Sequence, residues 1–175
     1  MNHIAYIGLG SNLEDPIRQL QRAFADLEAL PHTNLVERSS LYRSAPLGCP
    51  DQSDISSQPD LSSQPDFVNA VAKIITELAP QALLQALLNI EHQHGRERTF
   101  RNAPRTLDLD VLLYDDVQLH EDGLTIPHPQ MHRRAFVLQP LLEIAPDVTI
   151  PGVGPARLAL AGCQDQVLDR ILDVV

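Results

Sequence analysis

Residues 96–114 read Arg-Glu-Arg-Thr-Phe-Arg-Asn-Ala-Pro-Arg-Thr-Leu-Asp-Leu-Asp-Val-Leu-Leu-Tyr, and the rest of the chain is organised around this stretch. Its second half, from Thr106 onward, is rich in strand-forming residues that at first alternate with a period of two. Side chains two apart on a strand share a face. We therefore expect Asp108 and Asp110 to project together, while the leucines and the valine beside them point into a core.

The charges of this stretch indicate a site for a metal and a phosphate. Two neighbouring carboxylates repel each other unless a cation lies beside them, and Mg²⁺ commonly takes one or two carboxylates together with substrate phosphates. Guanidinium groups fit phosphate oxygens, and four of them precede the strand: Arg96, Arg98, Arg101 and Arg105. The alternative is that arginines and aspartates pair weakly with one another on a solvated edge. The concentration of positive charge in an acidic chain favours the metal and phosphate site.

Composition sets the wider limits. The chain has 175 residues, with 13 Lys and Arg against 23 Asp and Glu, which gives a net charge of −10. We expect one domain over residues 1–175, no general attraction to nucleic acid or membrane, and a monomer. Cys49 and Cys163 form neither a metal-site spacing nor a disulfide framework. No signal peptide or long apolar run is visible, which predicts a cytoplasmic protein.

Hydrophobic periodicity predicts an α+β fold with a ferredoxin-like βαββαβ core. The expected elements are strands at 4–10, 35–43, 67–77 and 106–114 and helices from Pro16 and over 80–94. This order gives an antiparallel sheet with helices on one face. Beyond it we expect a helix over 131–138 and, in 156–175, short helical patterns such as the apolar positions 167, 168, 171 and 172. These would form a C-terminal helical extension.

Two other segments bear on function. The turn after the first strand, Gly8-x-Gly10, lacks the third glycine of a dinucleotide-binding fold, and no P-loop is present. Residues 49–66 are rich in Ser, Gln, Pro and Asp and contain a six-residue tandem repeat. Such a segment has little to bury, so we predict a mobile inserted loop.

Several motifs together resemble one known family. Pro104-Arg105-Thr106-Leu107-Asp108-Leu109-Asp110 is similar to the signature of 6-hydroxymethyl-7,8-dihydropterin pyrophosphokinase, an enzyme of folate synthesis. Further similarities follow in order along the chain, at residues 10–13, 44–48, 67–70, 126–129 and 134–137. The resemblance runs from the first strand to about Pro146.

The resemblance implies a reaction and a set of site residues. The β,γ-diphosphate of ATP would pass to the hydroxymethyl group of the dihydropterin, with release of AMP and with Mg²⁺, expected as two ions, held by Asp108 and Asp110. The catalytic residues would be these two aspartates with Arg96 and Arg105. The residues implied for ATP are Glu91, Arg96, Arg98, Arg101, Arg105, Thr125, His128 and Arg134. Those implied for the pterin are Ser44, Ala45, Leu47, Phe67, Asn69 and Phe136.

Plainer interpretations exist for some of these residues. Glu91 could be a carboxylate on the solvent edge of its helix, and the two phenylalanines could belong to the core. His92 and His94 are two apart on a helix and therefore do not share a face, so we interpret both as surface residues.

The chain also departs from the family pattern in places. Asn102 stands where the family often has tryptophan, the loop between Arg98 and Pro104 is one residue shorter than in the longest members, and Gly123 stands where some members have arginine. Two other functions fit the same scaffold: a nucleotidyl transferase, which would release pyrophosphate, and a non-catalytic binding module.

Overall fold

The computed structural model describes residues 2–11, 16–44, 67–94, 107–121, 123–163, 166 and 168–171. The inserted-loop prediction for 49–66 lies outside these residues. The first part of the chain forms β1 (His3–Ser11), α1 (Pro16–Glu28), β2 (Thr33–Arg38), β3 (Leu41–Ser44), β4 (Phe67–Thr76), α2 (Pro80–Gln93) and β5 (Asp108–Tyr114). The second part forms β6 (Leu119–Glu121), β7 (Leu124–Ile126), η3 (Met131–Arg133), α3 (Ala135–Ile144), β8 (Thr149–Ile150), β9 (Gly154–Pro155), α4 (Ala156–Ala161) and β10 (Leu168–Ile171).

The main sheet has the topology that the periodicity predicted. Its strand order is β10-β3-β4-β1-β5, with β2 also paired to β4, and every pairing is antiparallel. With β2 and β3 counted as the two halves of one strand, the order of elements is βαββαβ, which is the ferredoxin-like arrangement. The fold-class prediction is therefore confirmed.

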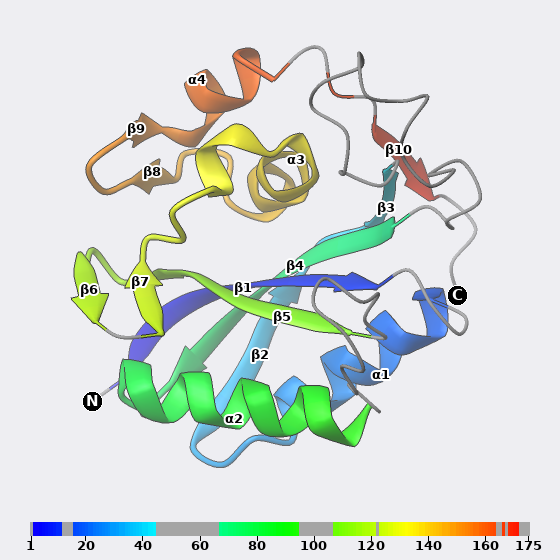
Figure 1. Cartoon of the computed structure of the whole chain (residues 1–175), viewed down its shortest axis with the longest axis vertical. Coiled ribbons are helices and arrows are strands. Elements are labelled where there is room, and N and C mark those ends of the chain that lie inside the picture. The colour runs from blue at the N-terminus through cyan, green and yellow to red at the C-terminus, as the bar shows by residue number, and fades with distance from the viewer. Residues whose placement is uncertain are drawn as a thin grey trace, which may run out of the picture.

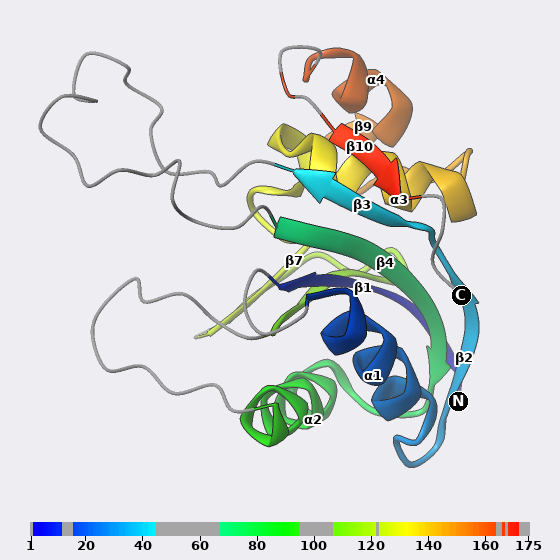
Figure 2. The ribbon, with the colours of Figure 1, turned by 90° about the vertical axis from the view of Figure 1, so that its right-hand side faces the viewer.

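The sheet separates two layers of helices. Helices α1 and α2 cover one face, while α3, α4 and the β8–β9 hairpin lie over the other (Figures 1 and 2). Apolar side chains at 3–4 residue spacing bury one side of α1, namely Leu20, Ala23, Phe24 and Leu27; this spacing places them on a single stripe. The resulting core lies between the sheet and the α1–α2 layer, and a second core lies beneath α3.

The expected second strand is interrupted. β2 ends at Arg38 and β3 begins at Leu41, with Ser39 and Ser40 between them. Ser39 donates its backbone N–H to Val71 O at 2.8 Å, and its hydroxyl accepts from Val71 N at 2.9 Å. The serine side chain thus replaces one bond of the backbone ladder, which sequence periodicity does not reveal.

The C-terminal extension differs from its prediction in one part. α3 and α4 are helical, but the segment that was expected to be helical near residue 168 is instead the strand β10, which pairs with β3 from Leu168 opposite Ser44 to Ile171 opposite Leu41. A helix this short is unstable on its own, whereas β3 offers backbone partners along its edge. The helix expected over 131–138 is a short 3₁₀ turn followed by α3.

Within the part of the chain that the structure describes, no helix has the length and apolar character needed to cross a membrane.

Candidate active site

A cleft lies on the α3 side of the sheet, and alternation along the strands supplies its floor. On β1, Ala5, Ile7 and Leu9 are buried in the core beneath α1 and α2, so the residues that follow each of them, Tyr6, Gly8 and Gly10, face the opposite way. Two of these are glycines, Gly8 and Gly10, which line the cleft. At these two positions β1 contributes backbone without side chains to the floor, and side chains of the neighbouring strands lean over it, with Leu112 near Gly8 and Asn69 near Gly10.

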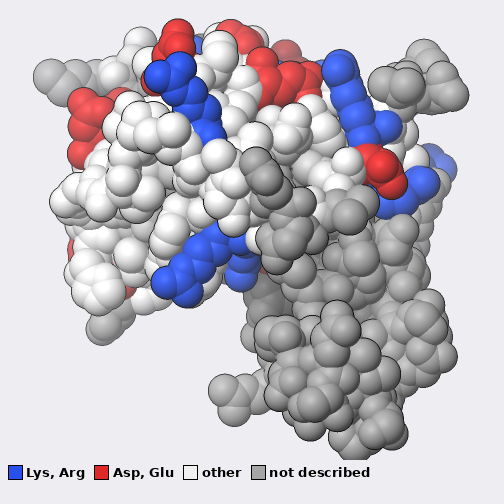
Figure 3. All heavy atoms as spheres, turned by 90° about the horizontal axis from the view of Figure 1, so that it is seen from above, with Lys and Arg blue, Asp and Glu red and all other residues white. Residues whose placement is uncertain are grey.

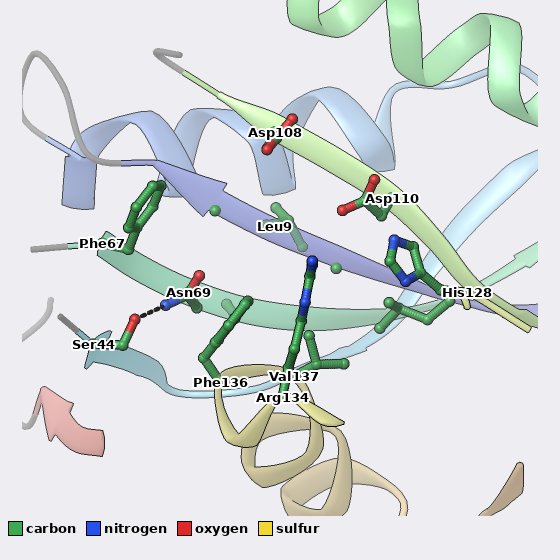
Figure 4. A pocket seen from close by; sticks show the side chains of 14 residues that line it. Leu9, Ser44, Phe67, Asn69, Asp108, Asp110, His128, Arg134, Phe136 and Val137 are labelled. Carbon is green, nitrogen blue, oxygen red and sulfur yellow. Dashed lines mark hydrogen bonds between the residues drawn. The ribbon is translucent and has the colours of Figure 1, made fainter. Parts of the chain in front are cut away.

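The register places these side chains in two rows across the sheet. Gly10 is opposite Asp108 on β5 and Asn69 on β4, and Gly8 is opposite Asp110 and Val71. The two aspartates line the same cleft (Figure 4), as the alternation predicted. The residues between and beside them, including Leu107 at 0% and Leu109 at 4% exposure, are buried in the helix-side core.

One end of the cleft is aromatic with polar groups at its edge. Phe67 begins β4 and Phe136 lies in the first turn of α3, and both line the cleft (Figure 4). Asn69 is 4% exposed and donates from Nδ2 to Ser44 Oγ at 2.8 Å. Its Oδ1 lies over Gly10, where it would be 3.1 Å from a Cβ atom. This end could receive a flat heterocycle with donors and acceptors at its rim.

The other end combines carboxylates with His128 and Arg134. His128 is placed by a bulge in β5, because Leu112 O accepts the His128 N–H at 3.0 Å and the register shifts at this point of the strand. Gln130 N donates to His128 Nδ1 at 3.1 Å. That bond places the proton of the neutral ring on Nε2, which makes Nε2 a donor.

The surroundings of His128 favour this neutral form. Burial lowers the pKa of His128 below its usual 6.5, the positive charge of Arg134 lowers it further, and Asp108 opposes both effects. At neutral pH His128 therefore donates one hydrogen bond without adding a positive charge.

Among the described residues that line the cleft, Arg134 carries positive charge; it is the residue before α3. Its guanidinium lies over the ring of Phe136, with Cζ 5.5 Å from the ring centroid, in the range of a cation–π contact. Figure 4 shows its side chain extending between Phe136 and His128 toward β1. On the outer face that carries α3 and α4, the described basic and acidic side chains are interspersed rather than gathered by sign (Figure 3).

The cleft brings together eight of the residues predicted from the sequence: Ser44, Phe67, Asn69, Asp108, Asp110, His128, Arg134 and Phe136. Six others lie outside the described residues, so their roles stay predictions: Ala45, Leu47, Arg96, Arg98, Arg101 and Arg105. Thr125 lies on β7 and lines a separate groove that shares His128 with the cleft. Its hydroxyl is 3.4 Å from His120 Nδ1.

Glu91 in α2 and His94, which caps the C-terminus of α2, differ from simple expectation. Glu91 is 2% exposed and does not sit on a solvent edge; it also does not line the cleft as described, so its contact with ATP stays a prediction. His94 was expected on the surface, and that expectation is wrong. It is buried and bonds to Gln19 Oε1 at 2.6 Å and Asp26 Oδ2 at 2.7 Å, because the last turn of α2 packs against α1.

Sequence reasoning missed the glycine floor. The Gly8-x-Gly10 pattern does not fit a nucleotide-binding turn, but its spacing of two within a predicted strand is itself a signal. It indicates a strip of sheet without side chains, where a ligand can approach the backbone.

Comparison with known proteins gives a consistent result. Residues 6–146 match the sequence model of a family described as 7,8-dihydro-6-hydroxymethylpterin-pyrophosphokinase. A 2-amino-4-hydroxy-6-hydroxymethyldihydropteridine pyrophosphokinase of Haemophilus influenzae is 50% identical over 147 residues, which cover 84% of each chain. The enzyme of the same name from Pseudomonas aeruginosa is 45% identical over 166 residues, which cover 95% of each chain.

Among solved structures, the wild-type HPPK-DHPS of Plasmodium falciparum is similar with a TM-score of 0.67 at 15% sequence identity. The match covers 93% of this chain and 45% of that one, so this chain corresponds to a little under half of the larger protein. At this identity the likeness supports the fold.

Proposed function

The chain belongs to the 7,8-dihydro-6-hydroxymethylpterin-pyrophosphokinase family, and we propose that its cleft transfers the β,γ-diphosphate of ATP to 6-hydroxymethyl-7,8-dihydropterin and releases AMP. The observation that carries this proposal is the division of one cleft into two ends. An aromatic end with an amide and a hydroxyl lies beside an end with two carboxylates, a histidine donor and an arginine. The two ends match the two substrates in chemistry.

The aromatic end would hold the pterin. Phe67 and Phe136 offer ring faces, and Asn69 offers an amide for the edge of the heterocycle. Ser44 accepts a hydrogen bond from Asn69, which leaves its own hydroxyl proton to donate. The glycine floor allows a flat ring to lie close to β1. Ala45 and Leu47 remain predicted contributors to this end.

Asp108 and Asp110 would hold Mg²⁺ against the phosphates. The donor set fits this ion: both carboxylates come from one face of β5, and each is opposite a glycine rather than a side chain. Among the described residues, no group of three or more His, Cys, Asp or Glu side chains comes together as a metal site. Mg²⁺ characteristically takes few protein carboxylates and completes its shell with phosphate oxygens and water. When bound, it would neutralise phosphate charge as transfer proceeds.

The transfer itself depends on position and charge. The pterin hydroxyl oxygen forms a bond to the β-phosphorus and loses its proton to solvent, while the bond from that phosphorus to the α,β-bridging oxygen breaks and AMP departs with that oxygen. Arg134 would neutralise charge on the phosphates, and His128 Nε2–H would donate to a phosphate oxygen. Arg96 and Arg105, from the segment before β5, would also neutralise charge on the phosphates. Such a site needs no protein nucleophile.

Product analysis tests the proposal. The purified protein is incubated with ATP, Mg²⁺ and the reduced pterin, and the nucleotides are resolved by chromatography. AMP together with a diphosphorylated pterin supports the proposal. ADP would indicate an ordinary kinase, pyrophosphate a nucleotidyl transferase, and unchanged ATP a binding module. Reactions without pterin or with the Asp108→Asn, Asp110→Asn double variant serve as controls.

A further inference from the structure

Glu91 makes a contact that the proposed reaction leaves unexplained. It lies in the last turn of α2, and α2 covers the face of the sheet opposite to α3 (Figure 1), whereas the cleft lies on the α3 side. Its Oε2 accepts the backbone N–H of Leu109 at 2.7 Å. Leu109 is the residue between Asp108 and Asp110. The Glu91 carboxylate therefore holds the β5 backbone, from the α2 side, at the midpoint of the aspartate pair.

The need for this contact follows from the place of β5 in the sheet. Among the described residues β5 is at one edge of the sheet, where its strand partner is β1. In an antiparallel ladder alternate residues direct their backbone N–H groups away from the partner strand. Leu109 is 4% exposed, and a buried N–H without an acceptor is costly. Glu91 supplies that acceptor and thereby holds the backbone of β5 in place at Leu109.

Glu91 is itself held in a fixed turn. His94, one turn further along, donates its backbone N–H to Ile90 O and Glu91 O at 3.1 and 3.2 Å. The His94 side chain is 1% exposed, and its two ring nitrogens bond to Gln19 and Asp26 of α1. The end of α2 is thus tied both to α1 and to β5, which makes it a rigid support.

We propose that Glu91 is a positioning residue for the Asp108–Asp110 pair, acting through the Leu109 backbone rather than by touching ATP. The inference rests on the proposed function, because the pair matters only if the aspartates hold Mg²⁺ and phosphate. With Glu91 in place the two carboxylates keep a fixed position relative to the glycine floor. Without an acceptor at this position, the edge strand moves or frays at the residue that separates them.

Three variants separate positioning from simple stability. Glu91→Leu removes the acceptor, and Glu91→Gln keeps an oxygen of similar reach. Leu87→Ala, one turn earlier and 1% exposed, is the matched control, because it destabilises the same helix by a cavity and leaves the Leu109 contact intact. For each protein we measure thermal unfolding, kcat and KM for both substrates, and NMR hydrogen exchange of the Leu109 amide relative to that of Ile7 in β1.

For Glu91→Leu we expect Leu109 exchange to accelerate relative to Ile7, and kcat to fall about tenfold or more with a smaller change in the KM for ATP, the scale of losing a supporting residue. Glu91→Gln should restore most of both. Leu87→Ala should lower the unfolding temperature while its kcat, measured well below that temperature, stays near wild type.

Two results would overturn the inference. One is an unchanged exchange ratio in Glu91→Leu; the other is a defect confined to the KM for ATP, which would show direct contact with the nucleotide. Exchange is measured without substrates, so it tests the contact even if the wild type forms no AMP. That last result would contradict the proposed function separately.

Discussion

The two faces of the central sheet are built from the same strands and both carry a buried core, but the cleft lies on the face toward α3. Toward α1 and α2, β1 and β4 present apolar side chains that are nearly all fully buried, such as Ile7 and Ile74. Toward α3, the same strands carry Gly8, Gly10, Phe67 and Asn69 in the cleft, while Val71 is buried in the second core beneath α3. Where the strands pass the cleft, a shift of one residue thus separates the groups that stabilise the fold from those available for chemistry.

The faces can be compared through two similar contacts. On the helix side Arg38 lies over Phe24, with Cζ 5.4 Å from the ring centroid, and in the cleft Arg134 lies over Phe136 at 5.5 Å. The geometry is alike, but Phe24 is 3% exposed in the core, whereas Phe136 lines a cleft. The burial of the phenylalanine ring, rather than the arginine–phenylalanine geometry, therefore decides which of the two rings a ligand can contact.

The largest effect is expected at the aspartates. Asp108→Asn or Asp110→Asn keeps the shape and removes charge, so turnover should fall on the order of 10²-fold or more. Thermal stability should hold or rise as the repulsion is relieved. On the other face Leu20→Ala should cost about 2–5 kcal/mol of unfolding free energy, with kcat unchanged while the protein is folded. Assays of turnover and unfolding together check this; near-normal turnover in both Asn variants would remove the metal assignment.

The paired phenylalanines give the next test. Phe136→Ala should raise the KM for the pterin about tenfold and change the KM for ATP less, because the ring faces the heterocycle end. Phe24→Ala should instead cost about 3–5 kcal/mol of stability and leave both KM values near wild type. Steady-state kinetics at a temperature where both variants are folded make the comparison. Equal effects on the two substrates would contradict the division of the cleft.

The glycine floor is expected to show a smaller effect. A Cβ atom at Gly10 would lie 3.1 Å from Asn69 Oδ1, so Gly10→Ala should displace the amide and raise the KM for the pterin several-fold. Stability should change little, because the displaced atom ends a side chain. Ala72→Gly, on the opposite, helix-covered face of β4, is the matched control. It should lower the free energy of unfolding by about 0.5–1 kcal/mol without changing the KM for the pterin. An unchanged pterin KM in Gly10→Ala would show that Asn69 does not read the ligand.

The smallest expected effect is a pH-dependent change in stability, which arises where Glu143 of α3 binds to Ser40 and to Tyr42 of the sheet. Glu143 accepts from Tyr42 OH at 2.7 Å and from Ser40 Oγ at 2.8 Å. Burial alone would raise the pKa of Glu143, but these hydrogen bonds and Arg170 lower it below 4.5 overall. A lowered folded-state pKa means that the carboxylate stabilises the fold above about pH 4.5 and that this contribution is lost as pH falls through the folded-state pKa.

Glu143→Gln should therefore unfold a few degrees below wild type at pH 7, and the gap should narrow at pH values below 4.5. Melting curves at several pH values check this. A gap that stays constant with pH would mean that the carboxylate charge does not hold α3. The bond to Glu143 also affects Tyr42. Burial raises the pKa of Tyr42 most, the hydrogen bond and the charge of Glu143 raise it further, and the result is a pKa of about 12.

The local pattern of the chain determined much of the site. Alternation placed Asp108 and Asp110 on one face and their neighbours in the core, and periodicity gave the βαββαβ order. Both follow from geometry within a single element, where side-chain direction repeats every two residues on a strand. The motifs then indicated the family, and the comparisons bear that out.

Other features depended on partners far away in the chain. Ser39 interrupts a strand because the Val71 N–H donates to its hydroxyl in place of a backbone carbonyl, and the segment at Leu168 is a strand because it pairs with the edge of β3. His94 is buried because α1 supplies Gln19 and Asp26, and Glu91 faces Leu109 because β5 lies above α2. A sequence states which hydrogen-bonding groups are available, but their satisfaction depends on which elements meet, and only the tertiary structure decides that.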